Sequence, residues 1–111
     1  MKHFLNIDEI SSKEILKIIK TSHKLKKNYG KIYLKKKKIL GMIFEKPSTR
    51  TRVSFEVGIK QMGGDVVVLD QNDSQLGRGE SLNDTVKVLS SYVDVIMYRG
   101  KEEKNLYEIS K

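Results

Sequence analysis

Three short apolar runs, each followed by a polar loop or a helical pattern, constrain the fold of this chain more than any other feature. The runs are residues 39–44 (Ile-Leu-Gly-Met-Ile-Phe), 66–69 (Val-Val-Val-Leu) and 94–99 (Asp-Val-Ile-Met-Tyr-Arg). The first two runs are continuous and apolar, which is typical of strands buried on both faces, and the third, between Asp94 and Arg99, is predicted to be a strand as well. Strands that alternate with helices need crossover connections, which make neighbouring strands parallel. The sequence therefore predicts an α/β fold of three layers, with a parallel sheet built from βαβ units.

The helical patterns around these runs have recognisable ends. Ser11 and Glu14 have the spacing of a capping box, and Gly30 follows the first helical pattern as a stop. A second helix is expected from about Thr51 to Met62, ended by Gly63 and Gly64, and a third from Leu82 to Tyr92. A fourth helical pattern opens at Lys101 and is interrupted at Lys111, so we expect a truncated domain whose sheet lacks its next strand.

Composition narrows the classes of partner. The net charge of +8 comes mostly from lysine, as in the run Lys35 to Lys38. Neither arginine nor aromatic residues are interleaved with these lysines, so a solvated face is a better interpretation than a nucleic-acid footprint. The chain has no cysteine, no apolar run of membrane-spanning length and no signal-peptide pattern. We expect a cytoplasmic protein that binds neither nucleic acid nor membrane.

The residues best suited to bind a ligand are predicted to lie at one rim of the sheet. In open parallel sheets ligands bind beyond the carboxyl ends of the strands, where the loops 45–50, 71–80 and the segment from Arg99 onward would meet. The first loop lies within the stretch FEKPSTRTRVSFEVG, residues 44–58. Its centre, residues 48–52, combines three hydroxyls and two guanidinium groups at the start of a helix, whose N–H groups and dipole favour an anion.

This motif has two other interpretations. Ser48 or Thr49 could simply cap the helix while Arg50 and Arg52 are solvated, because hydroxyl caps are common. A Walker phosphate loop does not fit, because the Gly-rich spacing that ends in Gly-Lys-Ser/Thr is missing.

The stretch 44–58, the run DVVVLD at 65–70 and the segment QLGRGESLNDTVKVLSSYVDVIMYRG at 75–100 resemble the carbamoyl-phosphate half of the transcarbamoylase family. The pentapeptide 48–52 is shared across that family and so implies carbamoyl phosphate without specifying the acceptor. The loop from Gln75 to Ser81 resembles that of the ornithine-accepting members, in which the glutamine reaches the phosphate bound to a neighbouring subunit. Aspartate-accepting members carry a catalytic lysine in this loop, and we interpret Arg78 as a solvated or interfacial residue.

The resemblance implies a role for each matching residue. Phosphate would be bound by Ser48, Thr49, Arg50, Thr51, Arg99 and, from a neighbouring subunit, Gln75. Arg50 and Arg99 would be catalytic by stabilising charge while the δ-amine of ornithine attacks the carbamoyl carbon. Arg52 and Glu80 would give structural support. No metal or other cofactor is called for, and His3 and His23 are expected on the surface.

The resemblance also implies what lies beyond residue 111. Residues 1–111 would be a truncated carbamoyl-phosphate-binding domain, with the ornithine-binding domain absent and the isolated chain inactive. The full-length protein would be a homo-oligomer, a trimer in this family. The alternatives are a transcarbamoylase for another amine, such as aspartate or putrescine, and a non-catalytic basic module that binds anions or nucleic acid.

Overall fold

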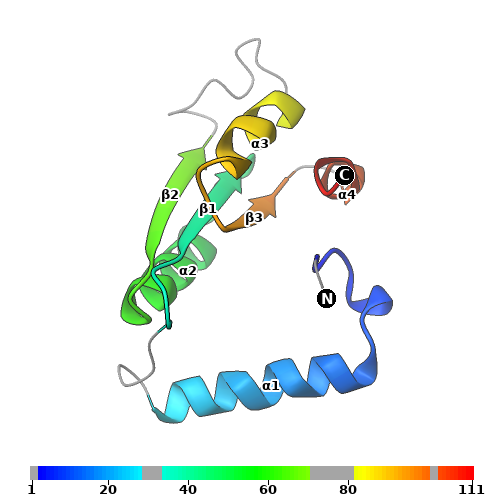
Figure 1. Cartoon of the computed structure of the whole chain (residues 1–111). Helices are drawn as coiled ribbons and strands as arrows, with labels where there is room; N and C mark the ends of the chain where they lie inside the picture. Colours follow the sequence, from blue (N-terminus) through cyan, green and yellow to red (C-terminus); the bar gives the residue numbers. More distant parts are fainter. Residues whose placement is uncertain (1–2, 29–33, 71–81, 101–102) are drawn as a thin grey trace. The chain divides into compact units, whose positions relative to one another are not determined.

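The computed structural model describes residues 3–28, 34–70, 82–100 and 103–111 (Figure 1). The chain divides into two compact units, Met1–Ile32 and Tyr33–Lys111, and each is described by itself. Within the described ranges, no helix combines the length and the apolar character needed to cross a membrane.

The first unit contains a short 3-10 helix, η1 (Ile7–Glu9), and the helix α1 (Ser12–Lys27). Ser11 is the N-cap of α1, and its hydroxyl accepts a hydrogen bond from the Glu14 N–H at 3.2 Å, which confirms the predicted start. The helix ends at Lys27 with Asn28 as its C-cap. The stop predicted at Gly30 lies outside the described residues.

The second unit is built on a parallel sheet of three strands in the order β2-β1-β3 (Figure 1). These are β1 (Ile39–Phe44), β2 (Asp65–Asp70) and β3 (Val95–Arg99). All three predicted strands are confirmed to within one residue at each end. The central strand β1 is buried from Leu40 to Phe44, as its continuous apolar run predicted.

Helices cover both faces of this sheet. They are α2 (Thr49–Gln61), α3 (Leu82–Ser90) and α4 (Glu103–Ile109). On one face Leu40, Met42 and Phe44 form a buried cluster against which Ile59 of α2 packs. On the other face Ile43 is buried with Val86 and Leu89 of α3, and Ile109 of α4 packs there too. The predicted three-layer α/β fold is therefore confirmed.

Gly41 explains how closely α3 approaches the sheet. A Cβ atom at this position would lie 2.9 Å from Leu89 Cδ2 and 3.2 Å from Val93 Cγ2. Real Cβ atoms essentially never come within 3.0 Å of a neighbour, so glycine, the only residue type without a Cβ, lets Leu89 of α3 rest on the strand backbone.

The expectation that 66–69 is a fully buried strand was wrong. Val66 and Val68 pack on the α2 side of the sheet, but Val67 on the other side is 41% exposed. Among the described helices, α3 reaches only as far as Leu69 on that face of β2. A run of apolar residues does not reveal how much of one face of an edge strand is covered by a helix.

Two helix boundaries also differ from the prediction. Helix α2 begins at Thr49, two residues before the predicted start, and the predicted stop after Met62 is confirmed because Gly63 has φ of 85°. Helix α3 ends at Ser90 and not at Tyr92. The N–H groups of Ser91 and Tyr92 bond to carbonyls three residues earlier, which tightens the chain into a turn there.

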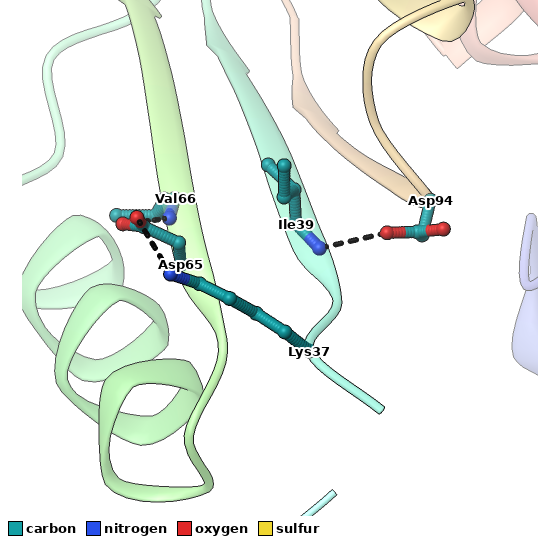
Figure 2. Close-up of polar contacts among 5 residues, drawn as sticks. All are labelled: Lys37, Ile39, Asp65, Val66 and Asp94. Atoms are coloured by element: carbon teal, nitrogen blue, oxygen red, sulfur yellow. Dashed lines mark hydrogen bonds and ion pairs between the residues drawn. The ribbon is translucent and has the colours of Figure 1, made fainter. Parts of the chain in front are cut away.

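Acidic side chains fix the strands at the amino edge of the sheet, remote from their carboxyl ends. Asp94 Oδ2 accepts a hydrogen bond from the Ile39 N–H at 2.8 Å (Figure 2). The Asp94 N–H donates to the Ile39 carbonyl at 2.9 Å. Asp65 Oδ1 accepts from the Val66 N–H, and its Oδ2 lies 3.8 Å from Lys37 Nζ (Figure 2). Lys38 Nζ lies 3.9 Å from Asp94 Oδ1. These exposed ion pairs fit the interpretation of the lysine run as a solvated face.

Candidate anion-binding site

The carboxyl ends of the three strands meet at one rim. Phe44, the last residue of β1, is in register with Asp70 at the end of β2 and with Arg99 at the end of β3. Parallel pairing therefore brings the loop after β1 next to Arg99, although they are about fifty residues apart in sequence. The other predicted rim loop, 71–80, lies outside the described residues, and so do Gln75, Arg78 and Glu80.

Alternation along β3 directs Arg99 toward helix α2. Successive side chains of a strand point to opposite faces, and Arg99 is paired with Phe44, which belongs to the buried cluster on the α2 side. Arg99 Nη1 donates one hydrogen bond to Ser48 Oγ at 2.9 Å and another to Thr51 Oγ1 at 3.1 Å. The structure thus joins three of the predicted site residues into one cluster.

These bonds leave the cluster suited to an anion. Each hydroxyl uses a lone pair to accept from Arg99, so its own O–H proton is still a donor. The guanidinium contributes a permanent positive charge at the same point. Hydroxyl donors and a fixed cation side by side are the usual ligands of phosphate oxygens.

Backbone geometry adds further donors at the start of α2. Ser48 is the N-cap in an extended conformation, and its carbonyl accepts the first intrahelical bond, from the Arg52 N–H at 3.2 Å. The N–H groups of residues 49–51 precede that bond and have no intrahelical acceptor. Within the described part of the chain the Ser48 hydroxyl makes no capping bond. The simple-cap interpretation therefore does not account for Ser48, whose hydroxyl contacts Arg99.

A cavity of about 210 Å³ opens beside this helix start. It is lined by Phe44, Glu45, Lys46, Pro47, Ser48, Thr49, Arg52 and Asp70. Thr49 thus contributes to the wall of the cavity, whereas Arg50 is exposed in the same helical turn and does not line it. The cavity is large enough for a small phosphorylated metabolite, and it adjoins the N–H groups of α2.

Arg52 is placed differently from the other residues of the motif. Its Nη1 lies 3.9 Å from Asp70 Oδ2, with the arginine side chain 47% and the aspartate side chain 26% exposed. This ion pair ties α2 to the end of β2 and balances part of the arginine charge. The arrangement supports a structural part for Arg52 more than direct binding of a ligand.

Sequence reasoning placed Glu45 in the rim loop 45–50, but it gave neither Glu45 nor Tyr98 a role in the site. The Tyr98 hydroxyl donates a hydrogen bond to Glu45 Oε1, and the Glu45 N–H donates to the Arg99 carbonyl at 2.9 Å. Their positions in the sequence could have pointed to them, because Glu45 opens the rim loop and Tyr98 directly precedes Arg99. His3 and His23 are exposed and belong to the first unit.

Comparison with known proteins identifies the family. Residues 2–111 match the family described as aspartate/ornithine carbamoyltransferase, carbamoyl-P binding domain. The chain belongs to this family.

The aspartate/ornithine carbamoyltransferases include a relative from Campylobacter curvus, named ornithine carbamoyltransferase, that is 49% identical over 115 residues. A relative of the same name from Caldicellulosiruptor saccharolyticus is 46% identical over 114 residues. Both alignments cover 100% of this chain but only 38% and 37% of the relatives, so the chain spans little more than a third of their length.

Solved structures of aspartate/ornithine carbamoyltransferases share the fold. The anabolic ornithine carbamoyltransferase of Campylobacter jejuni superposes with a TM-score of 0.89 at 43% identity, over 99% of this chain and 36% of that one. The aspartate transcarbamoylase of Trypanosoma cruzi, solved with carbamoyl aspartate and phosphate, gives 0.86 at 27% identity, over 98% of this chain and 36% of that one. The fold is therefore common to family members with different acceptors.

Proposed function

We propose that this domain binds carbamoyl phosphate, with the phosphate group at the N-terminus of α2. The observation that carries the proposal is the pair of hydrogen bonds from Arg99 to Ser48 and Thr51, which assembles donors and positive charge where the helix N–H groups lack intrahelical acceptors. Family membership supports the same ligand. Thr49 would bind through its backbone N–H, and Arg50 would move toward the ligand from its exposed position in the same turn.

The reaction proposed for the whole protein is carbamoyl transfer to an amine. The neutral δ-amine of ornithine attacks the carbamoyl carbon, forming a C–N bond and a tetrahedral species with a negative oxygen. The bond from that carbon to the phosphate oxygen then breaks, phosphate leaves, the nitrogen loses a proton, and citrulline forms. Arg50, Thr51 and Arg99 would stabilise the developing charge by preorganised electrostatics, because the reaction needs no covalent bond between substrate and protein.

Ornithine is the acceptor best supported by the relatives. Those nearest 50% identity carry the name ornithine carbamoyltransferase, whereas the aspartate transcarbamoylase catalytic subunit of M. jannaschii is 36% identical. The resemblance of the Gln75–Ser81 loop to ornithine-accepting members points the same way. Aspartate and putrescine are the alternative acceptors. Citrulline production would place the enzyme in arginine biosynthesis or a urea cycle.

The proposal includes the assembly and location of the protein. The whole protein would be a cytoplasmic homotrimer in which the Gln75 loop of one subunit reaches the phosphate bound to the next. Arg52 and Glu80 would support the two phosphate-binding segments. The binding of nucleic acid is not favoured, because the lysines nearest the sheet are paired with Asp65 and Asp94.

An acceptor competition tests this function. The full-length protein that contains this domain is supplied with carbamoyl phosphate and equal concentrations of ornithine, aspartate and putrescine, and the carbamoylated products are separated by chromatography. Citrulline is the expected product. Carbamoyl aspartate or carbamoyl putrescine as the main product would overturn the choice of acceptor, and no product with any amine would overturn the transferase proposal. This chain alone is expected to bind phosphate without forming citrulline.

A further inference from the structure

Glu45 and Tyr98 form a contact that the proposed phosphate site does not use. The Tyr98 hydroxyl donates a hydrogen bond to Glu45 Oε1. Tyr98 directly precedes Arg99, and Glu45 lines the cavity three residues before Ser48. A carboxylate so near to an anion-binding loop would repel a phosphate group through space. Where that carboxylate is held therefore matters for the affinity of the site.

Strand alternation separates the two sides of this region. Tyr98 is in register with Ile43 and packs against the cluster that Ile43 forms with α3, whereas Arg99 is in register with Phe44 on the α2 side. The side chains of these two neighbouring residues of β3 thus point to opposite faces of the sheet. The hydrogen bond to Tyr98 draws the Glu45 side chain toward the face that carries α3, while the N-terminus of α2 lies by the other face.

Gly100 makes the position of the tyrosine ring possible. A Cβ atom built at Gly100 would overlap the Tyr98 hydroxyl and adjacent ring carbons. The ring therefore occupies the space that any other side chain at position 100 would take. The Glu45 N–H also donates to the Arg99 carbonyl at 2.9 Å, so the backbone of this loop is held to the same strand end.

We propose that Tyr98 is a positioning residue of the anion site, whose hydroxyl holds the Glu45 carboxylate on the α3 side of the sheet and away from the N-terminus of α2. The inference rests on the proposed phosphate site. Without the hydroxyl the carboxylate is released and lowers the positive potential at Ser48 and Thr51. Removing the carboxylate charge as well should then restore binding.

Phosphate titrations of four proteins test this inference. Inorganic phosphate is added to the wild-type chain and to the variants Tyr98→Phe, Glu45→Gln and the double variant, and the backbone amide shifts of residues 49–51 are followed by NMR. Tyr98→Phe is expected to weaken phosphate binding about three- to tenfold, the size of one charge interaction at a partly exposed site. The double variant should return to within about twofold of wild type, and the loss in Tyr98→Phe should shrink in 0.5 M salt because ions screen the released charge.

The outcomes separate the inference from the proposed function. Unchanged affinity in Tyr98→Phe, or a loss that persists in the double variant and in high salt, would mean a merely structural role and overturn the inference. If Tyr98→Phe does not fold, Glu45→Gln still decides, because weaker phosphate binding by that variant contradicts a repulsive carboxylate. No shift at residues 49–51 in the wild type would count against the proposed phosphate site itself.

Discussion

At the scale of single residues, the two predicted catalytic arginines occupy different positions. Arg99 is joined to Ser48 and Thr51 by hydrogen bonds, whereas Arg50 is exposed at the first turn of α2. Arg99 therefore has a preorganised geometry, whereas the exposed Arg50 side chain would have to move to reach the proposed ligand. Composition and motif could identify both residues, but only the register of β3 against β1 shows which one is fixed.

Substitution of Arg50 tests whether its exposed side chain acts on the bound substrate. In the full-length protein, Arg50→Ala should lower kcat and kcat/KM together by at least about a hundredfold, as expected when a donor to transition-state charge is lost. Arg50→Lys should recover little of this, because a point charge does not replace a bidentate fork. Steady-state kinetics with carbamoyl phosphate varied measures both.

Lys60→Ala is the matched control for Arg50. Lys60 lies on the same helix, is exposed, and pairs only with nearby Glu56 at 4.0 Å among the contacts described for it. Its replacement should leave kcat/KM within about twofold of wild type, since exposed i,i+4 pairs contribute little. Nearly wild-type rates in Arg50→Ala would show that Arg50 is a solvated surface residue without a part in catalysis.

At the scale of helices and strands, most of the second unit could be predicted from sequence. Short, mostly apolar runs located β1, β2 and β3, although only β1 is buried along its length, and Gly63 ended α2 because it adopts a positive φ. The start of α2 at Thr49 was missed, since serine, threonine and arginine fit a loop or a first turn equally well. The bond between Tyr98 and Glu45 was also out of reach, because it depends on the strand register.

The amino edge of the sheet provides a stability prediction. Asp94→Ala removes a charge-assisted hydrogen bond to the Ile39 N–H together with the pair to Lys38, and should lower the free energy of unfolding by about 1–2 kcal/mol. Urea unfolding should show a lower midpoint with an unchanged m-value.

Asp65→Ala is the comparison for Asp94. In the described part of the chain, the Asp65 carboxylate accepts a backbone hydrogen bond only from the adjacent Val66 N–H and forms an exposed pair with Lys37, so its side chain bonds to no second strand there. Its loss should cost less than about 1 kcal/mol. Equal losses of unfolding free energy in the two variants would show that the hydrogen bond between Asp94 and the Ile39 N–H adds no stability beyond that of an exposed ion pair.

At the scale of the whole molecule, this chain spans little more than a third of its relatives' length, so the proposed sharing of a site between subunits is tested in the full-length protein. The Gln75 loop lies outside the described residues, and its proposed reach into a neighbouring subunit rests on family resemblance alone. The sequence of a single chain does not show to which subunit's site a loop contributes. Mixed oligomers of two variants can show this.

Subunit mixing tests the shared site. Gln75→Ala and Arg50→Ala proteins should each be nearly inactive, but unfolding and refolding them together should restore activity. In a cyclic trimer assembled at random from equal amounts, about a quarter of the interfaces combine an intact Arg50 with an intact Gln75. Citrulline formation near that fraction of wild type is expected. Inactive mixtures that have assembled into trimers would place both residues in the same subunit's site, whereas an active Gln75→Ala protein would remove Gln75 from it.

The most direct test of the central claim is a phosphate titration of this chain beside its Arg99→Met variant. Backbone amide shifts report where the anion binds, and methionine keeps an unbranched apolar side chain while removing the guanidinium. We expect saturable shifts at residues 49–51 in the wild type, from phosphate that carbamoyl phosphate displaces. The affinity for phosphate should be at least about tenfold lower in Arg99→Met, since one charged hydrogen-bonding group is lost. Shifts confined to the lysines 35–38, or equal affinity in the two proteins, would contradict it.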